Sequence, residues 1–543
     1  MVWHYKHCFF KAFPKLSVTL SYFNLGNSIL LFHRSLGIRN LFMSHLLSIE
    51  NALCRIGRQS ILKIDQFQIS TGQHWCIYGP NGAGKSLFAN LLIGRRLESQ
   101  NYVQSFANFQ PALDVFIVSF EEQQRLWQRD NRLDISEFSD QAQDLGTIVS
   151  QLICSGRKEP KLQLYDALMA DLDLNPIAEK GIRFLSSGQI RKVLIARALY
   201  AGRPGSAKLL VLDEPLESID RDSQQRIVNC IAKYLGNKCC SIQLCRRHRD
   251  MLPGITHIAL MENLTILQQG ALAEVLASPA FKKLTEIKLE FSNSVPKPLV
   301  IEANADTNKY SLIRLNNITV RYGELTVLTN VCWHMESNHH VLVEGPNGCG
   351  KSTLLSLIDG ENHKGYGQEV FLFGQKKGSG ETVWDVKRKF GIVSNELHNK
   401  YIKGWKVLDV VVSGFFDSVG LYDESSSAEW ELAKNWLATL GITELEKHYY
   451  HEISFGQQRV VLLARAMVKH PKILILDEPC VGLDDYYREL ILGVLDLIAE
   501  QTQTKLIYVS HVEDEQPACI NQKLTFVSSQ AGGFTLEQTN VGY

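Results

Sequence analysis

Two glycine-rich segments, far apart in the chain, have the residue types that bind phosphate. Each reads Gly-x-x-x-x-Gly-Lys-Ser, follows an apolar run that predicts a strand, and precedes a helical pattern. Glycines let backbone N–H groups surround phosphate oxygens, the lysine reaches the outer phosphates, and the serine hydroxyl is a ligand for Mg²⁺. The predicted binding residues are Gly79, Pro80, Asn81, Gly82, Ala83, Gly84, Lys85 and Ser86 in the first segment and Gly345, Pro346, Asn347, Gly348, Cys349, Gly350, Lys351, Ser352 and Thr353 in the second.

Two pairs of adjacent carboxylates could complete this chemistry. Asp213 and Glu214 end one apolar run, and Asp477 and Glu478 end another. An aspartate at a strand end can hold Mg²⁺ together with the serine of the glycine-rich segment. The neighbouring glutamate can polarise a water molecule as a general base, so we expect both glutamates to be catalytic. The predicted metal ligands are Ser86, Asp213, Ser352 and Asp477.

These motifs recur in the same order, which indicates two copies of one domain. A Ser-x-Gly-Gln element, preceded by an apolar residue, lies between the glycine-rich segment and the carboxylates in each half, within 185–189 and 453–457. Strand-like runs alternate with helical patterns, which predicts an α/β fold with a largely parallel sheet. The predicted boundaries are an N-terminal extension at 1–42, which an upstream mis-called start would explain, a first domain at 43–290, a polar linker at 291–308 and a second domain at 309–543.

The composition is that of a packed globular protein, with 45% hydrophobic and 21% charged residues. Lys+Arg and Asp+Glu both number 57, so the basic excess typical of a dedicated nucleic-acid-binding protein is absent. The 12 cysteines include no C-x-x-C pair, which argues against a disulfide framework, a zinc site or an iron–sulfur cluster. The nearest candidate for a membrane segment, 16–32, is interrupted by polar residues, and we expect no transmembrane helix.

The order of motifs resembles that of the ABC ATPase superfamily over about residues 46–543. Acidic turns at 218–220 and 482–484 and a histidine at 511 extend the match. The resemblance implies two P-loop NTPase domains in tandem, each with a helical subdomain, that pair head to tail and hydrolyse ATP with Mg²⁺. In that family the Ser-x-Gly-Gln signature of one domain covers the γ-phosphate held by the other. The further site residues that it implies are His511 as a catalytic switch, Tyr322 on the adenine, and Ser186, Gly188, Gln189, Ser454, Gly456 and Gln457 as nucleotide-binding residues.

The two composite sites should not be equivalent. Tyr322 supplies the family's aromatic residue in the second half, whereas Ile56 stands at the matching place in the first. Counting from the catalytic glutamates pairs His511 with Arg247, and His248 lies one place further. We therefore predict that site two, built on the second P-loop and the first signature, hydrolyses ATP faster. Site one, built on the first P-loop and the second signature, should bind ATP with slower turnover or none.

The loop that holds the family's water-positioning glutamine departs from the pattern in both halves. Its position maps to Asn395 in the second half and to Phe120 in the first, where Gln123 and Gln124 follow. Neither half therefore has the family's water-positioning glutamine at the expected place in this loop.

The motifs alone do not name a partner. The short linker is unlike the long charged spacer of ribosome-acting tandem proteins, and the cysteine modules of the DNA-repair and ribosome-recycling types are absent. Tandem sugar-import ATPases match in size, but their weakened half is the second. Stretches at 378–387, 413–420 and 454–459, with shorter ones at 118–121 and 185–188, resemble the ModF-type tandem ATPases associated with bacterial molybdenum transport and described in connection with photorepair.

That resemblance implies an ATPase component of molybdate import. It would lie in the cytoplasm, peripheral at the inner face of the plasma membrane, and bind a membrane permease without direct nucleic-acid contact. Two alternatives stay open. One is a soluble, non-transport ABC ATPase that acts on a ribosome or nucleic acid, and the other is a regulatory ATPase without mechanical output.

Overall fold

The computed structural model divides the chain into a unit of residues 1–43 and a unit of residues 44–543. The structure describes residues 45–56, 60–93, 103–105, 108–132, 146–157, 159–217, 219–236, 238–299, 311–323, 325–360, 362–401, 404–510, 512 and 515–541. The predicted N-terminal extension, its apolar segment at 16–32 and the end of the predicted linker lie outside these residues.

The first half contains a nine-stranded sheet with strand order β4-β1-β2-β9-β8-β3-β7-β6-β5. The strands from β8 through β5 in this order are parallel, and β3 and β7 are buried along their whole length. Burial on both faces is typical of parallel strands covered by helices. The strands are β1 (His45–Ile56), β2 (Ser60–Ser70), β3 (His74–Tyr78), β4 (Val103–Ser105), β5 (Val115–Val118), β6 (Lys208–Asp213), β7 (Cys239–Cys245), β8 (His257–Glu262) and β9 (Thr265–Ala271).

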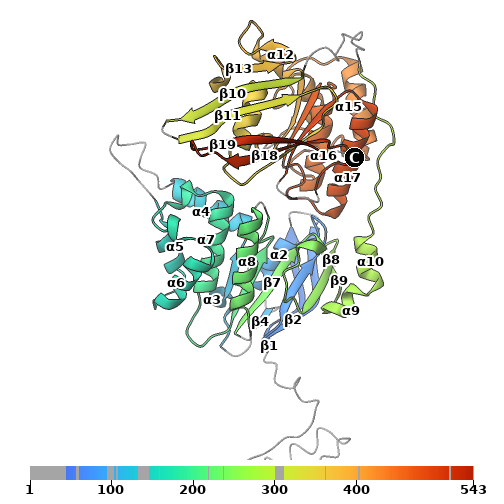
Figure 1. Ribbon diagram of the computed structural model, residues 1–543. Helices are drawn as coiled ribbons and strands as arrows, with labels where there is room; N and C mark the ends of the chain where they lie inside the picture. Colours follow the sequence, from blue (N-terminus) through green and yellow to red (C-terminus); the bar gives the residue numbers. More distant parts are fainter. Residues whose placement is uncertain are drawn as a thin grey trace, which may run out of the picture. The chain divides into compact units, whose positions relative to one another are not determined.

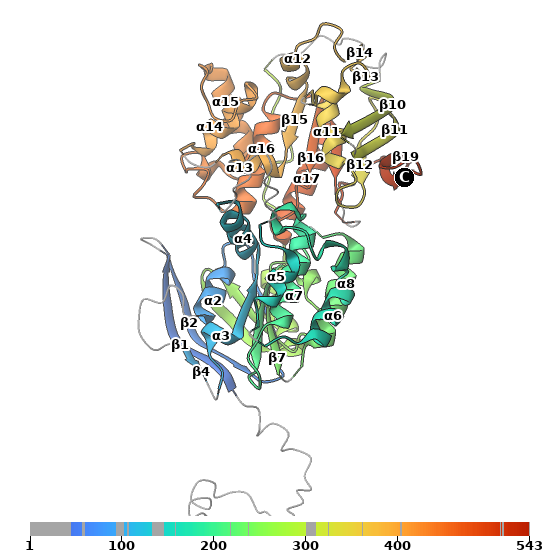
Figure 2. The same cartoon turned by 90° about the vertical axis from the view of Figure 1, so that its left-hand side faces the viewer.

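The helices of the first half fall into two groups. Figure 2 shows α5, α6 and α7 together, away from the antiparallel strands β1, β2 and β4. Their apolar faces share one core cluster, so they form the helical subdomain that the family resemblance implied. The helices are α2 (Lys85–Leu92), α3 (Pro111–Asp114), α4 (Phe120–Arg132), α5 (Val149–Cys154), α6 (Leu162–Asp171), α7 (Ser187–Tyr200), α8 (Arg221–Tyr234), α9 (Leu272–Leu276) and α10 (Pro279–Thr285).

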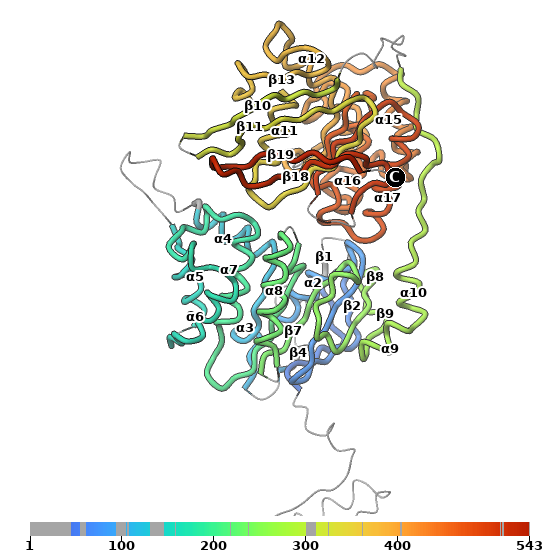
Figure 3. Tube along the Cα trace, viewed as in Figure 1, coloured from blue at the N-terminus to red at the C-terminus, as the bar shows by residue number. Residues whose placement is uncertain are grey.

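The second half repeats this plan in a ten-stranded sheet of order β14-β13-β10-β11-β19-β18-β12-β17-β16-β15. Of its last two strands, β19 pairs with β11 and β18 pairs with β19. The tube trace in Figure 3 shows both strands next to β11. The strands are β10 (Ile313–Tyr322), β11 (Leu325–Met335), β12 (Val341–Glu344), β13 (Glu369–Leu372), β14 (Gln375–Lys376), β15 (Phe390–Val393), β16 (Ile473–Asp477), β17 (Lys505–Val509), β18 (Gln522–Ser528) and β19 (Phe534–Asn540).

The second half has its own group of helices: α15, α16 and α17 lie together in Figure 1, and α14 lies beside α15 and α16 in Figure 2. Buried side chains of α14, α15 and α16 belong to one core cluster. The α/β fold with a helical subdomain in each half is therefore confirmed. The helices are α11 (Lys351–Ile358), α12 (Val383–Lys387), α13 (Asn395–Lys400), α14 (Val407–Val412), α15 (Ser427–Thr439), α16 (Phe455–Met467) and α17 (Asp485–Gln501).

The described part of the predicted linker packs against the second half. The amide of Ser292 donates to the carbonyl of Thr439 on α15 (2.8 Å), and the amide of Val295 donates to the side-chain oxygen of Gln501 on α17 (2.9 Å). The ring of Phe291 lies against Gly493, where a larger residue would meet it. The beginning of this connection is thus an ordered strap on α15 and α17.

None of the helices in the described parts of the chain is long and apolar enough to span a membrane.

Candidate active sites

The two glycine-rich loops have the same backbone conformation. Gly82 and Gly84 have φ of 80° and 99°, and Gly348 and Gly350 have φ of 81° and 103°. This left-handed region is open to glycine at little cost, which explains the residue type at these positions. Each loop leads directly into the first turn of a helix, α2 or α11, whose unpaired N–H groups favour an anion.

The first glycine of each loop is required by space. A Cβ on Gly79 would overlap the carbonyl oxygen of Met261 on β8, and one on Gly345 would lie 2.7 Å from the Cβ of Phe526 on β18. The loops are therefore pressed against a neighbouring strand. This packing holds the loop backbone in one conformation before any ligand binds.

The lysines of both loops fold back onto their own loop. Lys85 donates to the carbonyls of Gly79 (2.6 Å) and Pro80 (2.9 Å), and Lys351 donates to the matching carbonyls of Gly345 (2.8 Å) and Pro346 (3.1 Å). Burial lowers the pKa of the Lys85 ammonium, although the nearby Glu214 carboxylate opposes this. Both ammonium groups therefore lie within the loop that would hold the phosphates.

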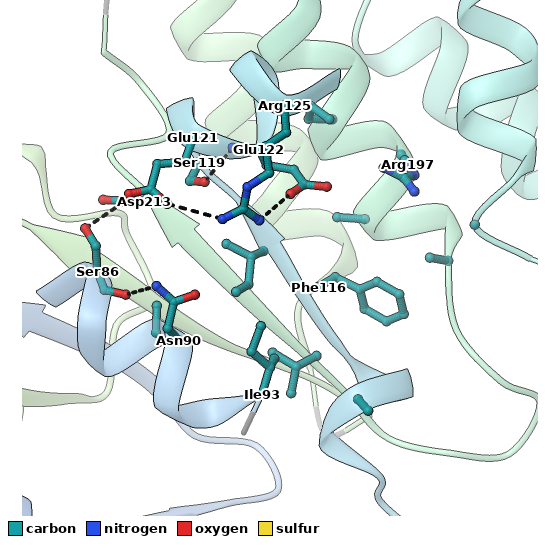
Figure 4. Close-up of a pocket in the computed structure, with 18 residues that line it drawn as sticks. Ser86, Asn90, Ile93, Phe116, Ser119, Glu121, Glu122, Arg125, Arg197 and Asp213 are labelled. Carbon is teal, nitrogen blue, oxygen red and sulfur yellow. Dashed lines mark hydrogen bonds and ion pairs between the residues drawn. The ribbon is translucent and has the colours of Figure 1, made fainter. Parts of the chain in front are cut away.

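The proposed metal ligands of the first half lie side by side. The hydroxyl of Ser86 lies 3.4 Å from the carboxylate of Asp213, which ends β6 (Figure 4). A hydroxyl and a carboxylate are oxygen donors of the kind that Mg²⁺ prefers, so this pair fits that ion. In the second half, Ser352 and Thr353 lie in the first turn of α11 and Asp477 ends β16.

Both glutamates that we predict to be catalytic have a strained backbone. Glu214 has φ of 45° and Glu478 has φ of 49°, a region that costs a side-chain-bearing residue about 1–2 kcal/mol. Burial raises the pKa of Glu214 to about 7, although Arg246 opposes this. Burial, and then the charge of Glu478, raises the pKa of Asp477 to about 6. A carboxylate with a pKa near neutrality is well matched to accept a proton from water.

The raised pKa of Glu214 predicts a pH-dependent effect of Glu214→Gln on the nucleotide-free protein. Folding shifts this pKa upward from about 4.5, so the folded state binds the proton more tightly and its stability falls as pH rises from about 4.5 to about 7. Glutamine removes this loss. We expect the melting temperature of Glu214→Gln to match the parent near pH 4.5 and to exceed it by a few degrees above pH 7. Scanning calorimetry measures this, and Glu274→Gln, at an exposed position, should show no such trend.

The signature residues have a local role that the motif alone did not reveal. Ser186 accepts from the amide of Gln189 (3.2 Å), and Ser454 accepts from the amide of Gln457 (3.3 Å). Each glutamine side chain in turn accepts from the backbone of its serine, so both motifs form capping boxes at the starts of α7 and α16. Gly188 and Gly456 lie in the first turns of the same helices.

The aromatic residue that we predict to stack on adenine lies at the end of a β-strand, next to a turn. Tyr322 ends β10 with 45% of its surface exposed. Its hydroxyl accepts from the side chain of Asn362 (3.0 Å), and the ammonium of Lys364 lies 5.9 Å from its ring centroid. An exposed, tethered ring of this kind can stack on a base. Ile56 ends β1 in the first half, but its side chain lies outside the described part of the structure, as does His511.

Strand register corrects the position that matches His511. Asp213 pairs with Leu244 between β6 and β7, and Asp477 pairs with Val509 between β16 and β17. The switch position, two residues beyond each partner, is therefore Arg246 in the first half. Arg247, which counting selected, is wrong by one place, because the segment between β6 and β7 is one residue shorter than its counterpart. No sequence motif marks this difference of one residue, and only the pairing of the strands reveals it.

The loops that hold the water-positioning glutamine in the family, here called the lid loops, contain other residues at that position in both halves. Asn395 begins α13 and accepts a hydrogen bond from Arg459 of the signature helix α16, so it is engaged within its own half. In the first half Phe120 begins α4 and is 52% exposed. Gln123 is fully buried, and neither of its side-chain polar atoms has a hydrogen-bond partner among the residues that the structure describes, whereas Gln124 is exposed.

A cavity of about 310 Å³ adjoins the metal-ligand pair of the first half. It extends from Ser86 and Asp213 past the lid residues on α4 to Arg197 on α7 (Figure 4). On its α4 side, Arg125 forms ion pairs with Glu121 (3.6 Å) and Glu122 (3.5 Å). No sequence pattern predicts this charged wall, because its three residues match no motif.

The acidic turn of the second half contacts the P-loop of the first. The amide of Asn81 donates to the carboxylate of Asp484 (2.8 Å), and its side chain donates to the carbonyl of Gly482 (2.9 Å). The same carbonyl accepts from Arg246 (3.1 Å). Residues of the second half therefore lie directly beside the first P-loop.

Comparisons with known proteins agree with this architecture. The sequence model of the family described as ABC transporter matches residues 62–217 and 328–481. The chain is 33% identical to the Escherichia coli ABC transporter ATP-binding protein ModF, over 87% of this chain and 95% of that protein. It is 26% identical to an uncharacterized ABC transporter ATP-binding protein of Schizosaccharomyces pombe, over 86% and 94% of the two chains.

Among solved structures, the fold is similar to that of the archaeal ribosome recycling factor aABCE1, crystallised with the ribosomal stalk protein aP1. The TM-score is 0.56 at 15% identity, over 90% of each chain. RNase-L Inhibitor gives a TM-score of 0.55 over the same shares. With two matched domains and preformed P-loops in each half, this chain belongs to the ABC transporter ATP-binding family and is a tandem ABC ATPase.

Proposed function

We propose that this chain hydrolyses ATP unequally at two composite sites and thereby drives a clamp cycle coupled to a transport partner. The observation that carries the proposal is the contact between the first P-loop and the acidic turn of the second half at Asn81. It joins the two halves at the place where ATP would lie. Binding at such an interface favours closure, and loss of the γ-phosphate favours opening.

In the proposed reaction, Lys85 and Lys351 contact the outer phosphates while the helix starts of α2 and α11 face their negative charge. Mg²⁺, held by the serine–aspartate pair of each half, neutralises phosphate charge when bound. At site two, Glu478 takes a proton from water as the water oxygen bonds the γ-phosphorus and the bond to the β–γ bridging oxygen breaks. The products are ADP and inorganic phosphate.

The proposed site two combines both halves. The second half supplies the P-loop, the aromatic residue, the carboxylates and the switch histidine, and the first supplies its signature. The residues that we assign to it are Tyr322, Lys351, Ser352, Asp477, Glu478 and His511 with Ser186, Gly188 and Gln189. The residues that we assign to site one are Lys85, Ser86, Asp213 and Glu214 with Ser454, Gly456 and Gln457.

The proposed partner is a membrane permease at the cytoplasmic face of the plasma membrane, with molybdate as the imported solute. The support is the relative that is 33% identical over nearly its whole length and bears the name of an ABC transporter ATP-binding protein. The ModF-type stretches in the second half point the same way. We expect no direct contact with nucleic acid, because the chain has no basic excess.

Capture of the closed state tests the partner. Tagged Glu478→Gln protein is cross-linked in cells, purified with Mg²⁺-ATP and compared with Lys351→Ala, which should bind ATP poorly at site two and close less. We expect the Glu478→Gln sample to be enriched in a membrane permease over this control. Enrichment of ribosomal subunits or DNA would overturn transport in favour of the soluble alternative. Molybdate uptake unaffected by Glu478→Gln would instead support the regulatory alternative.

A further inference from the structure

Two charged residues of the first half replace two different residues in the second. Glu217 lies four places after Asp213, where the second half has Val481 after Asp477. Arg246 takes the switch position, where the second half has a histidine. The additional carboxylate of Glu217 and the additional guanidinium of Arg246 therefore belong to the same half of the chain, which is also the half that contains Glu214.

The structure brings these two residues together. The guanidinium of Arg246 forms an ion pair with Glu217, and its Nε lies 3.6 Å from the carboxylate of Glu214. The backbone amide of Arg246 also donates to Glu214 (2.9 Å). The side chain of Arg246 is only 12% exposed, so the cluster is screened little by solvent.

Arg246 also reaches the second half of the chain. Its Nη1 donates to the carbonyl of Gly482 in the acidic turn, the group that also accepts from Asn81 of the P-loop. The two following residues continue the connection, because Arg247 forms an ion pair with Glu515 and His248 lies 3.6 Å from Asp485. The general base of site one is thus linked, through one guanidinium, to the turn that closes the site.

Arginine at this position differs chemically from histidine. Histidine can be neutral near pH 7 and can donate with one ring nitrogen while it accepts with the other. Arginine stays charged and only donates. A fixed cation 3.6 Å from the carboxylate of Glu214 attracts it at any pH near neutrality, whereas a histidine there could be neutral. Together with the backbone amide of residue 246, this charge draws the carboxylate toward residue 246.

We propose that Arg246 is a positioning residue that, together with Glu217, holds Glu214 away from the attacking water and makes site one an ATP-retaining site. This inference rests on the proposed function, and it assigns the slow turnover to two residues. It also gives the retained ATP a role, because the nucleotide would lie under the same turn that Arg246 and Asn81 hold. Site one then keeps the halves joined while site two opens and closes.

The test replaces Glu217 and Arg246 by the residue types, valine and histidine, that stand at the matching positions of the second half. In a Glu478→Gln background, which silences the faster site, we compare Glu217→Val/Arg246→His with the background alone. We expect hydrolysis per bound ATP at site one to rise at least tenfold, with little change in KM, and the half-life of retained radiolabelled ATP to shorten by a similar factor. Arg246→Lys, which keeps the charge, should leave hydrolysis low, and Arg249→His, at an exposed position, should have no effect.

An unchanged hydrolysis rate with intact ATP binding would overturn the assignment, as would an equal rise in Arg249→His. If the valine–histidine variant does not fold, Glu217→Gln/Arg246→Gln removes both charges while keeping polar side chains at both positions, and it carries the same expectation. Failure of the proposed function has a different signature, because Glu478→Gln alone would then leave the ATPase rate of the whole protein unchanged.

Discussion

Glu478→Gln lowers the steady-state ATPase rate of the whole protein by about 100-fold or more, whereas Glu214→Gln lowers it less than about threefold. Loss of a general base lowers the rate of hydrolysis at its own site by about 10²–10⁴-fold. The faster site carries most of the steady-state rate, so losing its base lowers that rate by a similar factor. Both glutamates have the same left-handed backbone, with φ of 49° and 45°, so their placement does not distinguish them. The residues at two nearby positions do distinguish them, because Arg246, which contacts Glu214 and Glu217, stands where the second half has His511, and Glu217 stands where it has Val481.

Phosphate release over a range of ATP concentrations measures this difference. Glutamine is close to glutamate in size, so both variants should bind ATP, and equilibrium binding of a fluorescent ATP analogue serves as the control. Equal losses of rate in the two variants would contradict the inequality of the sites. A larger loss in Glu214→Gln would reverse the assignment and make site one the faster site.

Trp436→Ala lowers the free energy of unfolding by about 3–5 kcal/mol, the largest stability effect that we expect from a single substitution. Trp436 is fully buried on α15 and lies in the core that α15 shares with α14 and α16. Removing its ring leaves a cavity among tightly packed helices. Because α16 begins at the signature serine, Ser454, the loss should also weaken ATP retention at site one.

Trp436→Phe separates the effect of the buried indole N–H on stability from the effect of the ring's volume. The indole N–H of Trp436 is buried with no hydrogen-bond partner in the described parts of the chain, and a buried unpaired donor costs about 1–3 kcal/mol. Phenylalanine removes that N–H along with some volume, so we expect a net loss below about 1.5 kcal/mol. Urea unfolding measures both variants, and Trp384→Ala, at a position that is 57% exposed, should change stability by no more than about 0.5 kcal/mol. A loss in Trp436→Phe equal to that in Trp436→Ala would contradict this account.

Much of the site could be predicted from the sequence because its parts are local. A P-loop is one strand end, one glycine-rich turn and one helix start, and all three lie within about a dozen residues. The same holds for the carboxylate pairs after β6 and β16 and for the signature at the starts of α7 and α16. In each case short-range conformation decides the structure, so residue types and spacing are enough.

The remaining features depend on contacts between distant parts of the chain. Register between β6 and β7 places Arg246, rather than Arg247, at the switch position, and a segment one residue shorter leaves no mark in the motifs. Packing likewise turns the beginning of the linker into a strap on α15 and α17. The charged wall of the cavity at α4 follows from helix placement and not from any pattern.

The sequence by itself determined that this chain holds two P-loop domains of the ABC type and which residues we expect to bind phosphate and metal, because each motif folds through its own neighbours. Only the tertiary structure decided which residues surround Glu214, the glutamate that we propose as the general base of site one. Glu214, Arg246 and Gly482 come from three separate segments, and long-range strand pairing and the packing of the second half's acidic turn bring them within hydrogen-bonding distance.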